Sequence, residues 1–91
     1  MTPELQEEIA RLLPAGACRA LLDMTGEWQF PGKGTFAENG AHSLHWAKTG
    51  LGRGAICERR INRAVGRAMY RLTSAGMEIA AAIRARGSPQ P

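Results

Sequence analysis

The sequence predicts an α+β domain with three helices, a β-hairpin and a fourth helix, in that order. Apolar residues recur at helical spacing over residues 1–24. Two short runs with the composition of strands then flank a turn that contains glycine, and a capped apolar stripe follows them. A chain of 91 residues has room for one such domain. We therefore expect residues 1–87 to fold together and residues 88–91 to form a flexible tail.

The first helix is predicted over residues 3–13, with Thr2 as its N-cap and Pro3 at its first position. Pro14 ends it, and a second helix follows over residues 15–24. Spacing predicts that these helices bury Leu5, Ile9, Leu12 and Leu13 from the first and Cys18, Leu21 and Leu22 from the second.

Residues 25–40 are broken up by glycine and proline. Trp28 and Phe30 alternate around Gln29, which indicates a short third strand beside the hairpin. A lysine and a threonine in this segment are separated by a glycine, and no leading strand precedes them. This spacing does not match a nucleotide-binding phosphate loop.

The third helix is predicted over residues 41–49, with Asn39 as its cap and Gly50 directly after its end. Leu44 and Ala47 should face the core with Leu51 after them. The opposite face should then carry His42, His45, Trp46 and Thr49, with Lys48 at its flank. We expect the glycine-rich link at residues 51–54 to be a slack joint.

Trp46 is a large apolar side chain on that outward face. We expect it to pack back against Trp28 or Phe30; the alternative is that it anchors a protein partner. A solvent-facing indole favours the protein partner, and a covered one favours a helix that faces a DNA groove.

The hairpin is predicted from residues 55–62 and 67–73, joined by residues 63–66 with Gly66 at a positive φ. In the second run Ala68, Tyr70 and Leu72 share one face, opposite Arg67, Met69 and Arg71. In the first run Ile56 and Ile61 have opposite parity, which predicts a bulge or an early end near Arg59.

Arginines gather on this hairpin with one acidic residue, Glu58, close in sequence. They are Arg59, Arg60, Arg63, Arg67 and Arg71. Such a cluster repels itself unless an anion lies against it. The alternative interpretation is a solvated basic hairpin without a role in nucleic-acid binding.

The last helix should begin after Thr73 and Ser74, both good N-cap residues, and end at Gly87. Its apolar stripe is Ala75, Ile79, Ala82 and Ile83. The segment YRLTSAGMEIAAAI resembles the Leu-Thr-x-x-Gly segment that closes the wing of many winged helix-turn-helix proteins, including MarR-like and PadR-like regulators. The resemblance implies a winged-helix fold, in which the hairpin is the wing and the third helix enters the major groove.

Charge is distributed unevenly along the chain. Residues 1–30 hold two basic and five acidic residues, net −3, whereas residues 31–91 hold ten basic and three acidic residues, net +7. This asymmetry suggests that one surface meets a polyanion. The two cysteines fit free thiols, and no long apolar run or leader pattern is present, so we expect a cytoplasmic protein without a membrane span.

The sequence offers little for catalysis or metal binding. Cys18, His42, His45 and Cys57 are the soft ligands, but the cysteines lack the close pairing of a structural zinc site. No nucleophile signature or pair of carboxylates appears. We expect no enzyme, no metal and no cofactor.

The first functional hypothesis is a winged-helix transcriptional regulator that binds duplex DNA, with a homodimer expected through the first and last helices. The residues expected to contact nucleic acid are Lys33, His42, His45, Lys48, Thr49, Arg53, Arg59, Arg60, Arg63 and Arg67. The alternative is a protein-binding module, such as a phage-encoded inhibitor or adaptor of a nucleic-acid-handling complex, that offers Trp28 and Trp46. Single-strand or RNA binding ranks third, because the chain has only five aromatic residues and we expect them not to interleave with the arginine cluster.

Overall fold

The computed structural model describes residues 1–87, and the predicted tail at residues 88–91 lies outside that range. Residues 1–87 form an α+β fold with four helices and one two-stranded antiparallel sheet. The helices are α1 (Pro3–Leu12), α2 (Ala15–Asp23), α3 (Glu38–His45) and α4 (Ser74–Gly87), and the strands are β1 (Cys57–Asn62) and β2 (Arg67–Leu72).

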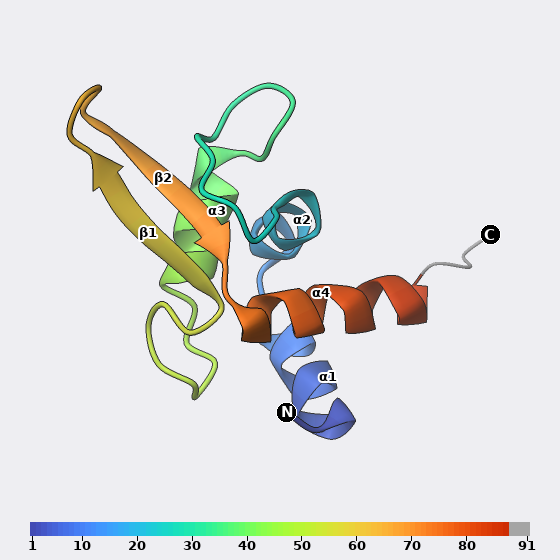
Figure 1. Ribbon diagram of the computed structural model, residues 1–91. Helices are drawn as coiled ribbons and strands as arrows, with labels where there is room; N and C mark the ends of the chain where they lie inside the picture. Colours follow the sequence, from blue (N-terminus) through green and yellow to red (C-terminus); the bar gives the residue numbers. More distant parts are fainter. Residues whose placement is uncertain (88–91) are drawn as a thin grey trace.

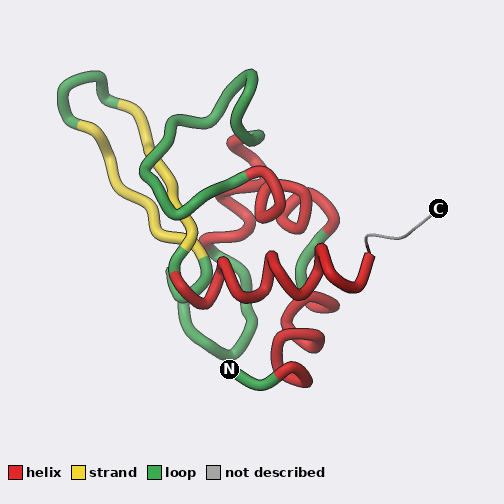
Figure 2. Tube along the Cα trace, turned by 45° about the vertical axis from the view of Figure 1, so that its right-hand side comes forward, coloured by secondary structure: helices red, strands yellow, loops and turns green. Residues whose placement is uncertain are grey.

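The hairpin projects beyond the helices, as two views of the chain show (Figures 1 and 2). In the helical part α1 packs against α4 and α2 packs against α3, and α3 also contacts β1. No helix in residues 1–87 has both the length and the apolar content needed to cross a membrane.

The core lies where the helices meet the base of the hairpin. Its largest fully buried side chains are Tyr70, Ile9, Leu21, Leu44 and Ile79. The ring of Phe36 meets that of Tyr70 edge to face, with centroids 6.0 Å apart. Tyr70 from β2 therefore ties the hairpin to the segment before α3.

The predicted stripes of α1 and α2 are partly wrong. Ile9 and Leu13 are buried, but Leu5 and Leu12 are exposed, because α1 packs mainly against α4 along one side. The start of α1 is as predicted, with the Thr2 hydroxyl accepting a bond from the Leu5 amide. In α2 the buried residues are Ala17, Ala20 and Leu21, whereas Cys18 and Leu22 are half-buried.

The third helix begins and ends earlier than predicted. It starts at Glu38, so the predicted cap Asn39 is already helical. This start brings Gly40 against α2, where a Cβ on Gly40 would stand 2.5 Å from the carbonyl oxygen of Gly16. The helix ends at His45, because the His45 carbonyl accepts a bond from the amide of Gly54 at 3.2 Å. Trp46 is its C-cap, so Gly50 plays no part in ending it.

The predicted bulge in β1 is also wrong. The two strands pair in unbroken register from Cys57 opposite Leu72 to Asn62 opposite Arg67. The parity conflict disappears because Ile56 lies before the strand, and Ile61 lies beyond the core with 48% of its surface exposed. The turn is as predicted, with Gly66 at φ +70°.

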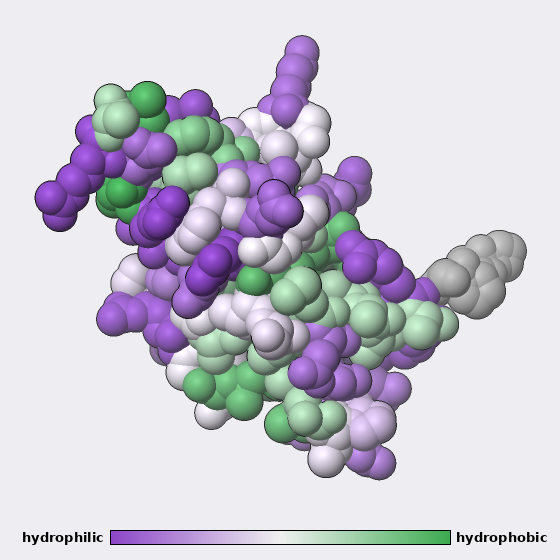
Figure 3. Space-filling model, viewed as in Figure 1, coloured by the Kyte–Doolittle hydropathy of each residue, from purple (hydrophilic) through white to green (hydrophobic). Residues whose placement is uncertain are grey.

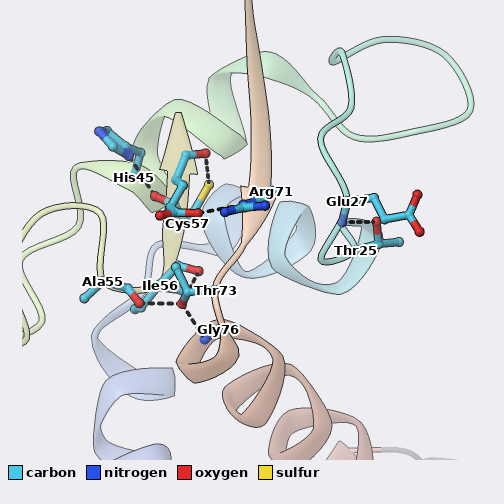
Figure 4. A network of polar contacts seen from close by, with 10 residues as sticks. Thr25, Glu27, His45, Ala55, Ile56, Cys57, Arg71, Thr73 and Gly76 are labelled. Carbon is cyan, nitrogen blue, oxygen red and sulfur yellow. Dashed lines mark hydrogen bonds and ion pairs between the residues drawn. The ribbon is translucent and has the colours of Figure 1, made fainter. Parts of the chain in front are cut away.

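The Leu-Thr-x-x-Gly segment fixes the end of the hairpin to the start of α4 (Figure 4). The Thr73 hydroxyl donates to the carbonyls of Ala55 and Ile56 and accepts a bond from the Gly76 amide at 3.1 Å, so Thr73 is the N-cap of α4. Gly76 is needed for space, since a Cβ there would stand 2.2 Å from the carbonyl oxygen of Ile56.

Candidate nucleic-acid interface

The hairpin carries arginines that lack carboxylate partners. Arg59, Arg60, Arg63 and Arg67 are exposed, and no carboxylate of residues 1–87 lies within 4.0 Å of their guanidinium nitrogens. Arg71 differs, because its Nε donates to Glu58 Oε1 at 2.6 Å. Figure 3 shows largely hydrophilic residues over the projecting hairpin, with hydrophobic ones at its tip. The hairpin is therefore an uncompensated basic surface.

The two faces of the hairpin differ in chemistry. Cys57, Tyr70 and Leu72 face the core and are buried. Arg59 shares their parity, but it lies further along β1, where its Nε is 3.4 Å from the Tyr70 hydroxyl. The opposite face carries Arg60 from β1, and from β2 it carries Arg67, Met69 and Arg71.

The predicted third strand is present as a single bridge beside β2. The amide of Gln29 donates to Tyr70 O, and the amide of Tyr70 donates to Gln29 O, both at 3.0 Å. Because neighbours in an extended segment point to opposite faces, this pairing places Trp28 and Phe30 on the outer face of the sheet.

On that face arginines and aromatic rings lie against one another. The Cζ atoms of Arg60 and Arg71 are 4.5 and 4.7 Å from the ring centroid of Trp28. The Cζ of Arg67 is 4.9 Å from the ring of Phe30, and Arg67 Nη2 donates to the Pro31 carbonyl at 3.2 Å. The expectation that the aromatic residues do not interleave with the arginines is therefore wrong. Tyr70 already lies between Arg67 and Arg71 in the sequence, and the fold brings Trp28 and Phe30 against the arginines as well.

Trp46 does not pack against Trp28 or Phe30. Trp46 is the C-cap of α3, and its side chain lies beside the glycine-rich link. The rings of Trp28 and Phe30 lie on the outer face of the sheet. Trp46 is 47% exposed, and the Cζ of Arg53 lies 4.4 Å from its ring centroid. Lys48 and Arg53 join it around an open hollow of about 530 Å³.

Two of the contact residues that were predicted to lie on the third helix, His45 and Thr49, are taken up by contacts within the fold. His45 Nδ1 lies 2.7 Å from the Cys57 carbonyl, which ties the end of α3 to the start of β1 (Figure 4). Thr49 is buried, because α3 ends before it and the chain turns inward. His42 and Lys48 remain exposed.

Lys33 is separated from the other predicted contact residues. It lines an open hollow of about 830 Å³ together with Arg19, Phe36 and Gly40, between α2 and the loop that precedes α3. The predicted basic set is thus divided: Arg59, Arg60, Arg63 and Arg67 lie on the hairpin, Lys48 and Arg53 in the link before it, and Lys33 elsewhere.

The histidines and cysteines do not gather. Within residues 1–87 no three side chains of the His, Cys, Asp and Glu types lie close enough together to hold a metal ion. Burial, reinforced by the charge of Glu58, raises the pKa of the Cys57 thiol to about 12. Cys57 is therefore protonated at neutral pH, which is unsuitable for a nucleophile.

Searches against protein-family models, curated proteins and solved structures returned no match for this chain. The geometry described above is therefore the basis for the proposals that follow.

Proposed function

We propose that this chain is a winged-helix protein that binds duplex DNA, mainly through phosphate contacts from its hairpin. The observation that carries the proposal is the set of four exposed arginines, Arg59, Arg60, Arg63 and Arg67, that lack carboxylate partners within residues 1–87. Guanidinium groups bind phosphate oxygens in a planar, bidentate geometry. Guanidiniums without carboxylate partners on a projecting ribbon are therefore suited to a polyanionic backbone.

The edge of the sheet supports this proposal. Gln29 bridges to β2, so β1 has an unpaired edge along which Arg59 is placed, with Arg63 in the turn beyond it. Arg53 and Lys48 continue the positive charge in the link that leads into β1. One line of cations thus follows β1 from its start to the hairpin tip.

The contribution of α3 is small in this proposal. The helix ends at His45, whose ring nitrogen bonds to Cys57, so His42 is the exposed histidine that remains for contact with a base. Its other exposed side chains include Glu38, Asn39 and Ser43, of which Asn39 is the one bidentate base reader. We therefore expect affinity with little sequence preference, and a regulatory role would need a second copy or another partner to select a site.

Binding of a random-sequence duplex across a salt series tests the proposal. Four phosphate contacts give a slope of log K against log salt of about −4, and replacing Arg59 and Arg63 together by glutamine should reduce its magnitude by about 2. Arg11→Gln combined with Arg19→Gln removes the same charge from α1 and α2 and should leave the slope unchanged. Equal effects of the two double variants, or binding that does not respond to salt, would rule the proposal out.

A protein-binding module is the second candidate, because Trp46 is solvent-exposed and a solvent-facing indole favours a protein partner over a groove-facing helix. It ranks second because the exposed indole argues against α3 as the DNA-contacting element and not against the arginines of the hairpin. Exposed tryptophans beside an arginine are common anchors of protein interfaces. A nuclease-resistant protein partner that is lost on Trp46→Ala and retained on Arg59→Gln with Arg63→Gln would favour this candidate.

A further inference from the structure

The outer face of the sheet carries two aromatic rings that the proposed duplex contact does not use. It combines the rings of Trp28 and Phe30 with the guanidiniums of Arg60, Arg67 and Arg71. The two strands of the hairpin and residues 28–30, which are distant from the hairpin in sequence, supply these groups side by side. The face is separate from the buried side of the sheet, which holds Tyr70 and Leu72.

Each guanidinium on this face lies within the 6 Å range of a cation–π contact, at 4.5 to 4.9 Å from a ring centroid. Such contacts keep a guanidinium near the ring while its N–H donors remain available at its edge. Nucleic-acid bases stack on aromatic rings and also on arginine planes. The face therefore offers a stacking surface and phosphate donors together.

We propose that this outer face is a binding site for unpaired nucleic acid. It shares Arg60 and Arg67 with the duplex contact and differs from it by the two rings. Base faces in a duplex are covered by their neighbours, so only unpaired bases can stack on protein side chains. Trp28 and Phe30 stand two residues apart in an extended segment, about 7 Å. This is about twice the 3.4 Å between stacked bases of one duplex strand, so both rings can be used only by an unstacked strand.

Charge complementarity selects a polyanion for this face. Arg60 and Arg67 are exposed and have no carboxylate within 4.0 Å among residues 1–87, while the pairing of Glu58 with Arg71 leaves that carboxylate partly neutralised. An acidic protein segment would pair with the guanidiniums but would leave the two rings without a stacking partner. A single nucleic-acid strand supplies phosphates for the guanidiniums and bases for the rings.

Each tryptophan can be observed alone. Trp46→Phe leaves Trp28 as the single tryptophan, and Trp28→Phe leaves Trp46. Titration with short oligothymidylate should quench the fluorescence of Trp28 in the first variant to saturation and should leave Trp46 in the second nearly unchanged. Quenching confined to Trp46, or none in either folded variant, would overturn the proposal.

Inorganic polyphosphate separates base stacking from charge alone. At low salt, polyphosphate should compete with the oligonucleotide for the protein without quenching Trp28. Equal quenching by polyphosphate would contradict the stacking role. Oligouridylate in place of oligothymidylate shows whether RNA or DNA is preferred, and binding of either supports the proposal.

Substitutions on the outer face test which residues contribute to the affinity for the single strand. Trp28→Leu should weaken oligothymidylate binding about tenfold, because stacking on one ring is lost. Arg60→Gln should weaken it several-fold, whereas Arg11→Gln should have no effect. Circular dichroism establishes that each variant is folded. If Trp28→Leu is unfolded, Phe30→Leu gives the same test on the second ring.

Two variants test the duplex proposal and the single-strand proposal independently of each other. Arg59→Gln with Arg63→Gln should reduce duplex binding and retain the quenching of Trp28 by the single strand. Trp28→Leu should have the opposite pattern. Equal loss of both activities in both variants would mean one undivided basic surface and would overturn the separate outer site.

Discussion

The hairpin has two connections to the helical part, and they are built in opposite ways. The exit from β2 into α4 is tight: Thr73 bonds to both Ala55 and Ile56, and Gly76 lies against the Ile56 carbonyl. The entry from α3 into β1 is open, with Gly50, Gly52 and Gly54 at positive φ and little space-filling contact around them. The comparison indicates that the exit holds the hairpin in place while the entry leaves Trp46 and Arg53 accessible.

Replacing Gly76 by alanine should have the largest effect. Its Cβ would overlap the Ile56 carbonyl, so the backbone must move, and we expect a loss of about 3 kcal/mol in the free energy of unfolding. Gly16→Ala is the matched control, because a Cβ at Gly16 meets nothing within 4 Å and alanine favours the helix. Urea denaturation measures both variants, and similar stability for the two would show that the exit is not tight.

A substitution at the entry should cost less. Gly50 has φ +85° but no atom near its missing Cβ, so Gly50→Ala adds backbone strain without overlap, about 1 kcal/mol. A larger loss than that of Gly76→Ala would reverse the comparison. The fluorescence of Trp46, measured in a Trp28→Phe background, should report a local change that far-ultraviolet circular dichroism does not.

Alkaline pH gives the smallest expected effect and tests how well the start of β1 is closed. The Cys57 thiol has a pKa of about 12 when folded, raised from the ordinary value of 9.0. Above pH 9 the unfolded chain loses this proton and the folded chain keeps it, so stability falls as pH rises. At pH 9.5 the loss from this group is about 0.8 kcal/mol.

The Cys57→Ala variant lacks this titration, so its stability should decline less steeply between pH 8 and pH 10 than that of the unsubstituted chain. Thermal unfolding at a series of pH values measures the difference in slope. Parallel curves would mean that Cys57 is not protected from solvent at the hairpin base.

Much of the local structure could be predicted from short stretches of sequence. Thr2 and Thr73 cap their helices, Gly66 takes the left-handed conformation in the turn, and the alternation of Ala68, Tyr70 and Leu72 identifies the buried face of β2. Each of these depends on the physics of a few neighbouring residues. The alternation of Trp28 and Phe30 also predicts a short third strand beside the hairpin, but it predicts neither the partner Tyr70 nor the consequence for the arginines.

The predicted bounds of α3 are wrong because contacts with segments distant in sequence decide where the helix begins and ends. The end of α3 depends on the Gly54 amide reaching back to His45, and its start depends on the contact of Gly40 with α2. Gly40 and Gly76 each lie close to a backbone carbonyl of another segment, and such a contact leaves no periodic pattern in the sequence. In the sequence, Gly76 is marked only by the family resemblance of the Leu-Thr-x-x-Gly segment.

The sequence by itself determined that the arginines concentrate on a hairpin closed by a capped helix, because charge, alternation and capping are properties of adjacent residues. Only the tertiary structure decided which groups those arginines meet. Trp28 and Phe30 come beside Arg60, Arg67 and Arg71 because Gln29 and Tyr70 pair backbone to backbone. Such a pairing depends on the path of the whole chain between them, which no local pattern specifies.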